Sequence, residues 1–168
     1  MFRFPTLLLL SAITLTISCK SFRESPPKTT KGTVDKTNIT IHYGSPSVKD
    51  RKIFGELLPY DQVWRTGANE ATTIEFSTNV TIEGKSLPAG KYSLFTIPNE
   101  DQWTIIFNKV SDQWGAYEYD QKEDALRVQV SANDNSELVE DLTFTVEKGM
   151  VILNWEKTTV SFTVAPGN

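Results

Sequence analysis

The sequence is short of the residues that build covalent and metal-dependent sites. Among 168 residues there is one cysteine, Cys19, and one histidine, His42. A single thiol cannot form a disulfide within the chain, so stability must come from a packed core. A single histidine would leave only carboxylates to complete a zinc site, and no metal or other cofactor is predicted. The Gly-x-Ser-x-Gly motif is also missing, which argues against hydrolytic catalysis through His42.

Long basic runs are missing as well. The chain carries 17 Lys and Arg against 21 Asp and Glu, which gives a formal net charge of −4. Nucleic-acid binding surfaces need clustered positive charge, and this mildly acidic chain offers no such cluster in its sequence. The composition therefore argues against nucleic acid as a partner.

The N-terminus has the form of a secretory signal. Arg3 precedes an apolar run, residues 5–17, that is shorter than the length a transmembrane helix needs to span a bilayer. Cys19 ends the sequence LTISC, which resembles the lipobox where bacterial lipoproteins are cleaved and acylated. We therefore expect Cys19 to carry a lipid that anchors the protein to a membrane. Because Lys20 and Ser21 provide no acidic retention signal, the bacterial outer membrane is the expected location.

A polar segment separates this signal from the rest of the chain. Residues 19–37 contain two adjacent prolines, scattered Lys and Thr, and almost nothing apolar to bury, which is typical of a flexible tether. Residues 38–168 are enough chain for one domain with its own core. The expected organisation is a signal peptide (1–18), a lipidated tether (19–37) and a single domain (38–168).

The domain shows the period-two alternation of β-strands and no sustained helical period. Clusters of Gly, Pro, Asn and Asp mark turns between the apolar runs. Strands are predicted at residues 39–43, 72–77, 80–83, 91–97, 103–108, 126–131, 142–147, 151–155 and 160–164. This pattern predicts an all-β fold, a two-sheet antiparallel β-sandwich of jelly-roll or immunoglobulin-like kind.

Three long motifs follow one another along the domain. They are YGSPSVKDRKIFGELLPYDQVWRTGANEATTIEFS, LPAGKYSLFTIP and WTIIFNKVSDQWGAYEYDQKEDALRV. Together they closely resemble the bacterial family called domain of unknown function 2911, over residues 43 to about 162. The resemblance implies a secreted or lipid-anchored, β-rich envelope protein, and it brings no assigned activity.

The first candidate site is the segment WRTGANE, residues 64–70. Arg51 and Arg65 both have the rigid fork that suits a carboxylate or phosphate, and two such forks could clamp an anion. The alternative is structural. In that interpretation Trp64 is buried, and Arg65 pairs with Glu70 or with another acid.

The second candidate is the stretch DQWGAYEYDQKED, which gathers aromatic residues among acids. An aromatic ring can pack on the apolar face of a sugar while carboxylates read its hydroxyls. The spacing of the acids does not match a known calcium loop. The alternative is a solvated connection whose aromatics dock on the edge of the sheet.

These observations predict a lipid-anchored envelope protein with a non-catalytic binding or structural domain that contacts glycan or an envelope protein. The rival hypothesis is a small envelope enzyme in which Arg51 and Arg65 hold an anionic group and Glu70 is the acid or base. The enzyme would bring these three side chains into one cleft. The candidate ligand-binding residues are Tyr43, Arg51, Trp64, Arg65, Asn69, Glu70, Trp114, Tyr117 and Tyr119.

Overall fold

The computed structural model describes residues 23–167, and this part of the chain is all-β. Its strands are β1 (Pro27–Val34), β2 (Thr37–Gly44), β3 (Thr73–Phe76), β4 (Val80–Ile82), β5 (Lys85–Leu87), β6 (Gly90–Ile97), β7 (Gln102–Asn108), β8 (Asp124–Glu147) and β9 (Met150–Pro166). One 3-10 turn, η1 (Gln121–Glu123), precedes β8. Within residues 23–167 no helix is long and apolar enough to span a membrane. The expected signal peptide (1–18) and the lipidation site Cys19 lie outside the described residues.

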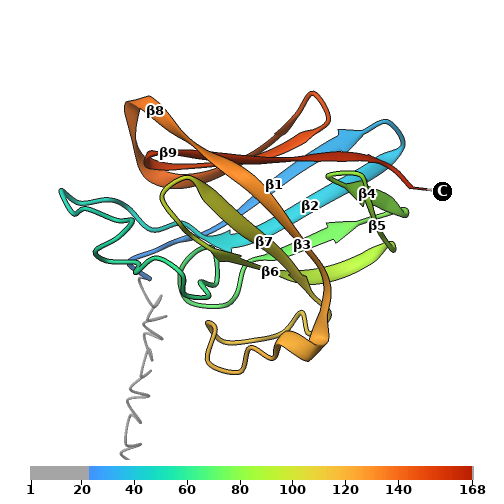
Figure 1. The fold of residues 1–168 in the computed structure, drawn as a ribbon, viewed down its shortest axis with the longest axis horizontal. Helices are drawn as coiled ribbons and strands as arrows, with labels where there is room; N and C mark the ends of the chain where they lie inside the picture. Colours follow the sequence, from blue (N-terminus) through green and yellow to red (C-terminus); the bar gives the residue numbers. More distant parts are fainter. Residues whose placement is uncertain (1–22, 168) are drawn as a thin grey trace, which may run out of the picture.

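All strand pairs are antiparallel, and hydrogen bonds connect the nine strands in the order β1-β2-β3-β6-β7-β8-β9-β4-β5. The long strand β8 makes this continuity possible. Its first part pairs with β7, and its remainder pairs with β9 across two register shifts, so the sheet bends over its own core (Figure 1). The predicted all-β antiparallel class is confirmed. Two separate sheets of jelly-roll or immunoglobulin-like kind are not, because one connected sheet accounts for all nine strands.

The predicted tether is wrong for residues 27–34, which form β1. This strand pairs with β2 along its whole length, from Pro27↔Gly44 to Val34↔Thr37. Its threonines have the β-branched side chains that favour strands, and Thr30 Oγ1 also donates a 2.9 Å hydrogen bond to the carbonyl of Phe144 on β8. The polar composition that suggested a tether suits an edge strand, where lysines discourage pairing with other chains. The domain therefore begins well before residue 38.

The other predicted strands match the structure more closely. The expected strands at 126–131 and 142–147 are both parts of β8, and those at 151–155 and 160–164 are both parts of β9. The short strand β5 was not predicted. It forms a tight hairpin with β4 through Glu83 and Gly84, whose φ angles of 47° and 76° are those of a type I′ turn.

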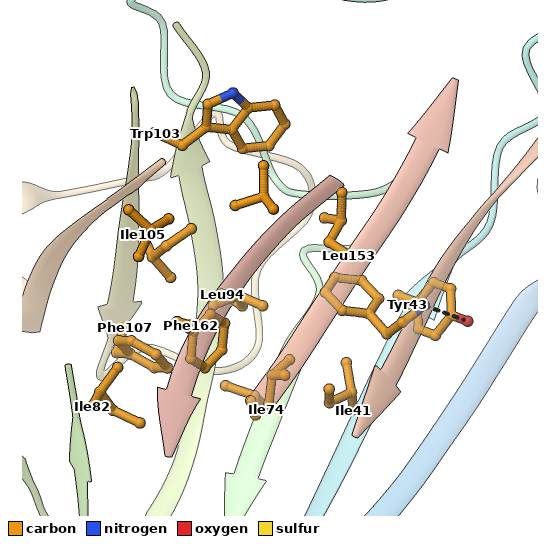
Figure 2. Packing of buried hydrophobic residues seen from close by; sticks show 14 of the residues in the cluster. Ile41, Tyr43, Ile74, Ile82, Leu94, Trp103, Ile105, Phe107, Leu153 and Phe162 are labelled. Carbon is orange, nitrogen blue, oxygen red and sulfur yellow. Dashed lines mark hydrogen bonds between the residues drawn. The ribbon is translucent and has the colours of Figure 1, made fainter. Parts of the chain in front are cut away.

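The core lies between the facing parts of the bent sheet (Figure 2). Alternate residues of β2, β3, β6 and β7 point inward, where they meet Leu153 and Phe162 of β9. Tyr43 packs edge-on against Phe144, with ring centroids 4.9 Å apart. One end of the core is aromatic, and this end forms the floor of the site described below. Its rings belong to Phe54, Trp64, Trp103 and Trp155.

Candidate functional site

The arginine loop, residues 64–70, is anchored to the sheet by its first residue. The backbone N–H of Trp64 donates to Thr96 O at 2.7 Å, and Thr96 N–H donates back to Trp64 O at 2.9 Å. The Trp64 side chain is only 6% exposed, and its Nε1 donates to Gly67 O at 3.1 Å. The buried Trp64 thus fixes the start of the arginine loop against Thr96 of β6 and closes a tight turn through its bond to Gly67.

The middle of the arginine loop is strained. Thr66 has a φ of 56°, a left-handed conformation that is a true outlier for a β-branched residue. It is fully buried, its Oγ1 hydrogen-bonds with Thr96 Oγ1 at 3.1 Å, and its carbonyl accepts from Thr72 Oγ1 at 2.9 Å. A Cβ on the next residue, Gly67, would lie 2.9 Å from Gly44 O. These contacts fix a backbone shape that the local sequence alone would not favour.

Residues 23–26, which we call the N-terminal strap, close over this loop. Arg23 Nη1 donates to both carboxylate oxygens of Glu70, at 2.7 and 2.8 Å. Asn69 Nδ2 donates to Ser25 O at 3.1 Å, and Lys49 forms an ion pair with Glu24. The hydrogen bond from Arg23 lowers the pKa of Glu70 below its usual value.

The predicted pairing of Arg65 with Glu70 is therefore not formed. Glu70 has Arg23 as its partner, 47 positions away in the sequence. Arg65 is one of the residues that line a cavity of about 380 Å³ beneath the strap, but its Nη1 lies 3.8 Å from the position that a Cβ on Gly115 would take, beside the aromatic loop. The cavity wall consists of Glu24, Ser25, Pro46, Ser47, Lys49, Arg51, Leu57, Leu58, Trp64, Arg65, Gly67, Ala68 and Trp155. We call this space the arginine cavity.

Arg51 also lines the arginine cavity, but its guanidinium donates to backbone carbonyls of the preceding turn. Its Nε donates to Val48 O at 2.9 Å and its Nη2 to Ser47 O at 2.7 Å. Arg51 and Arg65, the two predicted anion-binding residues, thus both line this cavity, but the Arg51 guanidinium is bonded to its own turn and Nη1 of Arg65 lies beside Gly115.

Glu70 and Tyr43 line a different groove, of about 490 Å³, on the other side of the strap. His42 lies in the same groove, where it is exposed and its Nδ1 shares a 2.9 Å hydrogen bond with Thr29 Oγ1. The three residues of the rival enzyme hypothesis, Arg51, Arg65 and Glu70, are therefore not gathered in one cleft.

The aromatic loop, residues 109–123, displays two of its predicted aromatic residues. Trp114 is 58% exposed and Tyr117 is 85% exposed. The loop touches the arginine loop through Ala71 N–H, which donates to Gln113 O at 3.0 Å, and through a bridge between Glu70 and Trp114.

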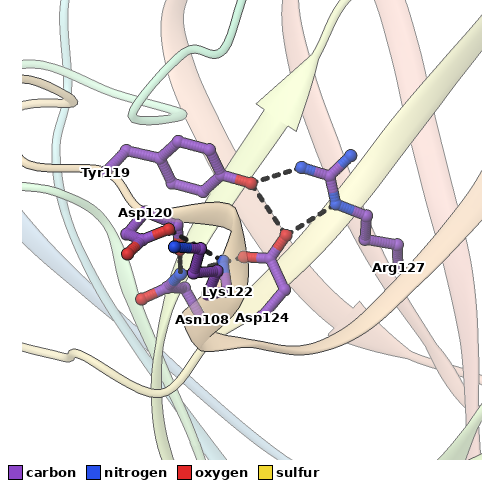
Figure 3. A network of polar contacts seen from close by, with 6 residues as sticks. All are labelled: Asn108, Tyr119, Asp120, Lys122, Asp124 and Arg127. Carbon is purple, nitrogen blue, oxygen red and sulfur yellow. Dashed lines mark hydrogen bonds and ion pairs between the residues drawn. The ribbon is translucent and has the colours of Figure 1, made fainter.

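Tyr119, the third predicted aromatic, serves a different purpose. Its ring packs edge-on against Phe95, 5.0 Å between centroids. Its hydroxyl donates to Asp124 Oδ2 at 2.7 Å, and the same carboxylate oxygen accepts from Arg127 Nε at 2.6 Å (Figure 3). Burial, followed by the hydrogen bond to Asp124, raises the pKa of Tyr119 to about 12.

Asn108 extends this network to the start of the aromatic loop. Its Nδ2 donates to Asp120 O at 3.0 Å and to Asp124 Oδ1 at 2.9 Å, while its Oδ1 accepts from Val110 N–H at 3.1 Å. The loop is consequently fixed at both ends, although its middle is exposed.

Sequence reasoning missed the residues that support the two sites. Asp124 and Arg127 have spacing i, i+3, but nothing in the sequence distinguishes them from the other acids and bases near them. Trp155 was predicted only as a strand residue, and no sequence signal marks it as part of the cavity wall. Within residues 23–167, no group of three or more His, Cys, Asp or Glu side chains could hold a metal ion.

Comparison with known proteins gives a family and no further relative. The family model described as "Protein of unknown function (DUF2911)" matches residues 25–164. No curated protein and no solved structure matches the chain.

Proposed function

We propose that this chain, which belongs to the DUF2911 family, is a lipid-anchored protein of the bacterial envelope whose domain binds glycan without catalysis. The observation that carries the proposal is the pair Trp114 and Tyr117. They are the two most exposed large apolar side chains within residues 23–167. Exposed aromatic rings that the fold holds in place are what a sugar-binding surface requires.

The geometry of the aromatic loop supports this role. Gly115 has a φ of 67°, and a Cβ there would lie 3.2 Å from the ring of Tyr117. The ring thus rests on the backbone of Gly115 and is held outward. Because the Tyr119 network already orders the loop, less conformational entropy is lost on binding. Asp112 and Glu118, both exposed on this loop, offer acceptors for sugar hydroxyls.

The proposed lipid anchor places this surface near the membrane. Acylation at Cys19 would leave three residues between the lipidated cysteine and the strap at Arg23, and the four residue steps from Cys19 to Arg23 span at most about 14 Å when extended. The link between lipid and domain is therefore much shorter than the 19–37 tether, and the target of the site should be envelope material close to the lipid surface.

The experiment is a glycan-array and peptidoglycan pull-down with the full chain and its Trp114→Ala variant. We expect the wild type to bind and Trp114→Ala to lose binding while its thermal unfolding is unchanged. Leu138→Ala is the matched control, because Leu138 is similarly exposed, at 55%, but lies on β8. Equal binding by all three proteins, or binding by none, would overturn the glycan proposal and direct attention to an envelope protein as the partner.

The enzyme alternative has less support. Its proposed acid or base, Glu70, has a side chain that is 52% exposed and already engaged by Arg23. A general acid or base must lie within hydrogen-bond reach of the group whose proton it transfers, and Glu70 lies outside the cavity that Arg51 and Arg65 line.

A further inference from the structure

Gly115 lies where the aromatic loop meets the arginine loop. It has a φ of 67°, and the position that a Cβ would take there lies 3.2 Å from Cδ2 and from Cε2 of Tyr117 and 3.8 Å from Nη1 of Arg65. Apart from the chain neighbours of Gly115, these are the three heavy atoms nearest to that position. The Arg65 guanidinium and the exposed ring of Tyr117 therefore lie on the same side of the Gly115 backbone.

Backbone hydrogen bonds fix Arg65 beside the aromatic loop. Its carbonyl accepts from Thr72 N–H at 3.1 Å, which ties the start of the arginine loop to the residues that follow it. Ala71 N–H donates to Gln113 O at 3.0 Å, which ties the same segment to the aromatic loop. Because the backbone is held in this way and Nε of the side chain is buried, the guanidinium loses little conformational entropy when a ligand binds.

The donors of Arg65 are also unused by the rest of the described chain. Of the four arginines within residues 23–167, Arg23 and Arg127 form ion pairs and Arg51 donates to two backbone carbonyls. The Arg65 side chain has no acceptor in this part of the chain. Its Nε is the one nitrogen of the side chain that is buried without a hydrogen bond, so Nη1 and Nη2 are the ones that a ligand can reach. A guanidinium donates and cannot accept, so a ligand here must bring an acceptor.

Two acids at the ends of these loops already have cations. Glu70, the last residue of the arginine loop, accepts from Arg23 with both carboxylate oxygens, at 2.7 and 2.8 Å. Asp124, which directly follows the aromatic loop, accepts from Arg127 Nε at 2.6 Å. Neither carboxylate is left to neutralise Arg65. The positive charge of Arg65 is therefore available to an anionic group of a ligand.

The groups on this surface suit different parts of one sugar. Asp112 and Glu118 are exposed and can accept from hydroxyl groups. The Tyr117 ring supplies an apolar face for a pyranose. Arg65 offers parallel donors in a rigid fork, a geometry that fits a planar carboxylate better than a single hydroxyl. A hydroxylated ring that carries a carboxylate would engage all three.

We infer that the glycan bound at the aromatic loop is acidic, with a sugar carboxylate held by Nη1 and Nη2 of Arg65 and the sugar ring packed on Tyr117. This inference rests on the proposed glycan binding and names the class of sugar, a uronic acid or another sugar acid. It also gives Arg65 the role of the residue that distinguishes acidic from neutral glycans.

The test uses the full chain and pairs of matched oligosaccharides. Each pair is an oligosaccharide of glucuronic or galacturonic acid and the same oligosaccharide with its carboxylates reduced to neutral alcohols. We expect the wild type to bind an acidic member about tenfold more tightly than its reduced counterpart, a factor typical of a charge-assisted hydrogen bond. This comparison needs no variant, and calorimetric titration measures both affinities.

Two substitutions then assign the preference to Arg65. Arg65→Lys keeps the charge but loses the fork, and Arg65→Gln loses the charge as well, so the preference for the acidic member should shrink in the first and vanish in the second. Trp114→Ala should weaken both members equally. Arg23→Lys is the matched control, because Arg23 is an exposed arginine that pairs with Glu70, and it should keep the wild-type preference. Thermal unfolding confirms that each variant is folded.

The outcomes separate this inference from the glycan proposal. Equal binding of acidic and reduced oligosaccharides by the wild type would overturn the acidic assignment and leave glycan binding in place. Binding of neither member of any pair would overturn both. Tighter binding of sulfated oligosaccharides would overturn the carboxylate as the group recognised. An unchanged preference in folded Arg65→Gln would overturn the role of Arg65.

Discussion

The arginine loop and the aromatic loop lie side by side, but opposite kinds of interaction hold them. Neutral hydrogen bonds of buried backbone and hydroxyl groups fix the middle of the arginine loop, and an exposed ion pair with Arg23 holds Glu70 at its end. Within residues 23–167 the charged side chain of Arg65 has no hydrogen-bond acceptor. A charged network of Tyr119, Asp124 and Arg127 fixes the aromatic loop, and its apolar rings remain exposed.

The difference shows which groups each loop has left for a ligand. In the arginine loop the fold buries the aromatic residue Trp64 and leaves Arg65 without an acceptor in residues 23–167. In the aromatic loop the charges of Asp124 and Arg127 are used to hold Tyr119, and the rings of Trp114 and Tyr117 stay exposed. The same types of residue therefore serve opposite roles, and only the contacts of each side chain distinguish architecture from candidate site.

The largest effect on stability should come from removing the N-terminal strap and β1, which support the arginine loop and not the aromatic loop. A chain that starts at residue 38 lacks the strap and β1, so β2 loses its partner along eight residue pairs and Glu70 loses Arg23. We expect this chain to show no cooperative transition in urea when followed by circular dichroism. A chain that starts at residue 23 is the control and should unfold cooperatively. Equal cooperative transitions would restore the interpretation of residues 27–37 as a tether.

A smaller but still large effect is expected from Gly44→Ala. A Cβ at Gly44 would lie 2.1 Å from Ala68 O, so the arginine loop would have to move away from β2. We expect the free energy of unfolding to fall by about 4 kcal/mol, the size typical of severe steric disruption.

Gly84→Ala provides the comparison for this variant. Gly84 has a φ of 76°, but nothing lies within 4 Å of its added Cβ. The left-handed conformation alone should cost about 1 kcal/mol. Urea denaturation of both variants measures the difference, and equal losses would show that contact with the arginine loop is not what requires a glycine at position 44.

Much of the fold could be predicted from the sequence because alternation of apolar residues directly reflects burial on one face of a strand. The exceptions have physical reasons. β1 is an edge strand with mainly polar residues, and its polar composition predicted a flexible tether instead of a strand. Asn133, Asp134 and Asn135 have turn chemistry, yet β8 continues past them with a register shift, since pairing with β9 outweighs local preference.

The candidate site was predictable only in part. Burial of Trp64 follows from its residue type, and the exposure of Tyr117 fits its polar neighbourhood. The partner of Glu70 could not be predicted, because Arg23 is 47 positions away and lay in the supposed tether. The role of Trp155 in the cavity also depends on the bend of the sheet, which brings β9 under the arginine loop.

The smallest effect concerns the charged network and appears only at high pH. Burial and the hydrogen bond to Asp124 raise the pKa of Tyr119 from its ordinary value of 10.0 to about 12. Because the folded value is the higher one, the neutral phenol favours the folded state fully below pH 10, and this contribution is lost as the pH rises towards 12. The aromatic loop should loosen in this range.

The ultraviolet absorbance of the phenolate measures this shift, as the difference between the wild type and Tyr119→Phe during titration. We expect the midpoint of the difference near pH 12. Asp124→Asn removes the carboxylate that accepts the Tyr119 proton, so in that variant the same difference should titrate at lower pH. A wild-type midpoint near pH 10 in the folded protein would mean that the aromatic loop is not held by this network. The aromatic loop would then be held by Asn108 and by the backbone contact at Gln113.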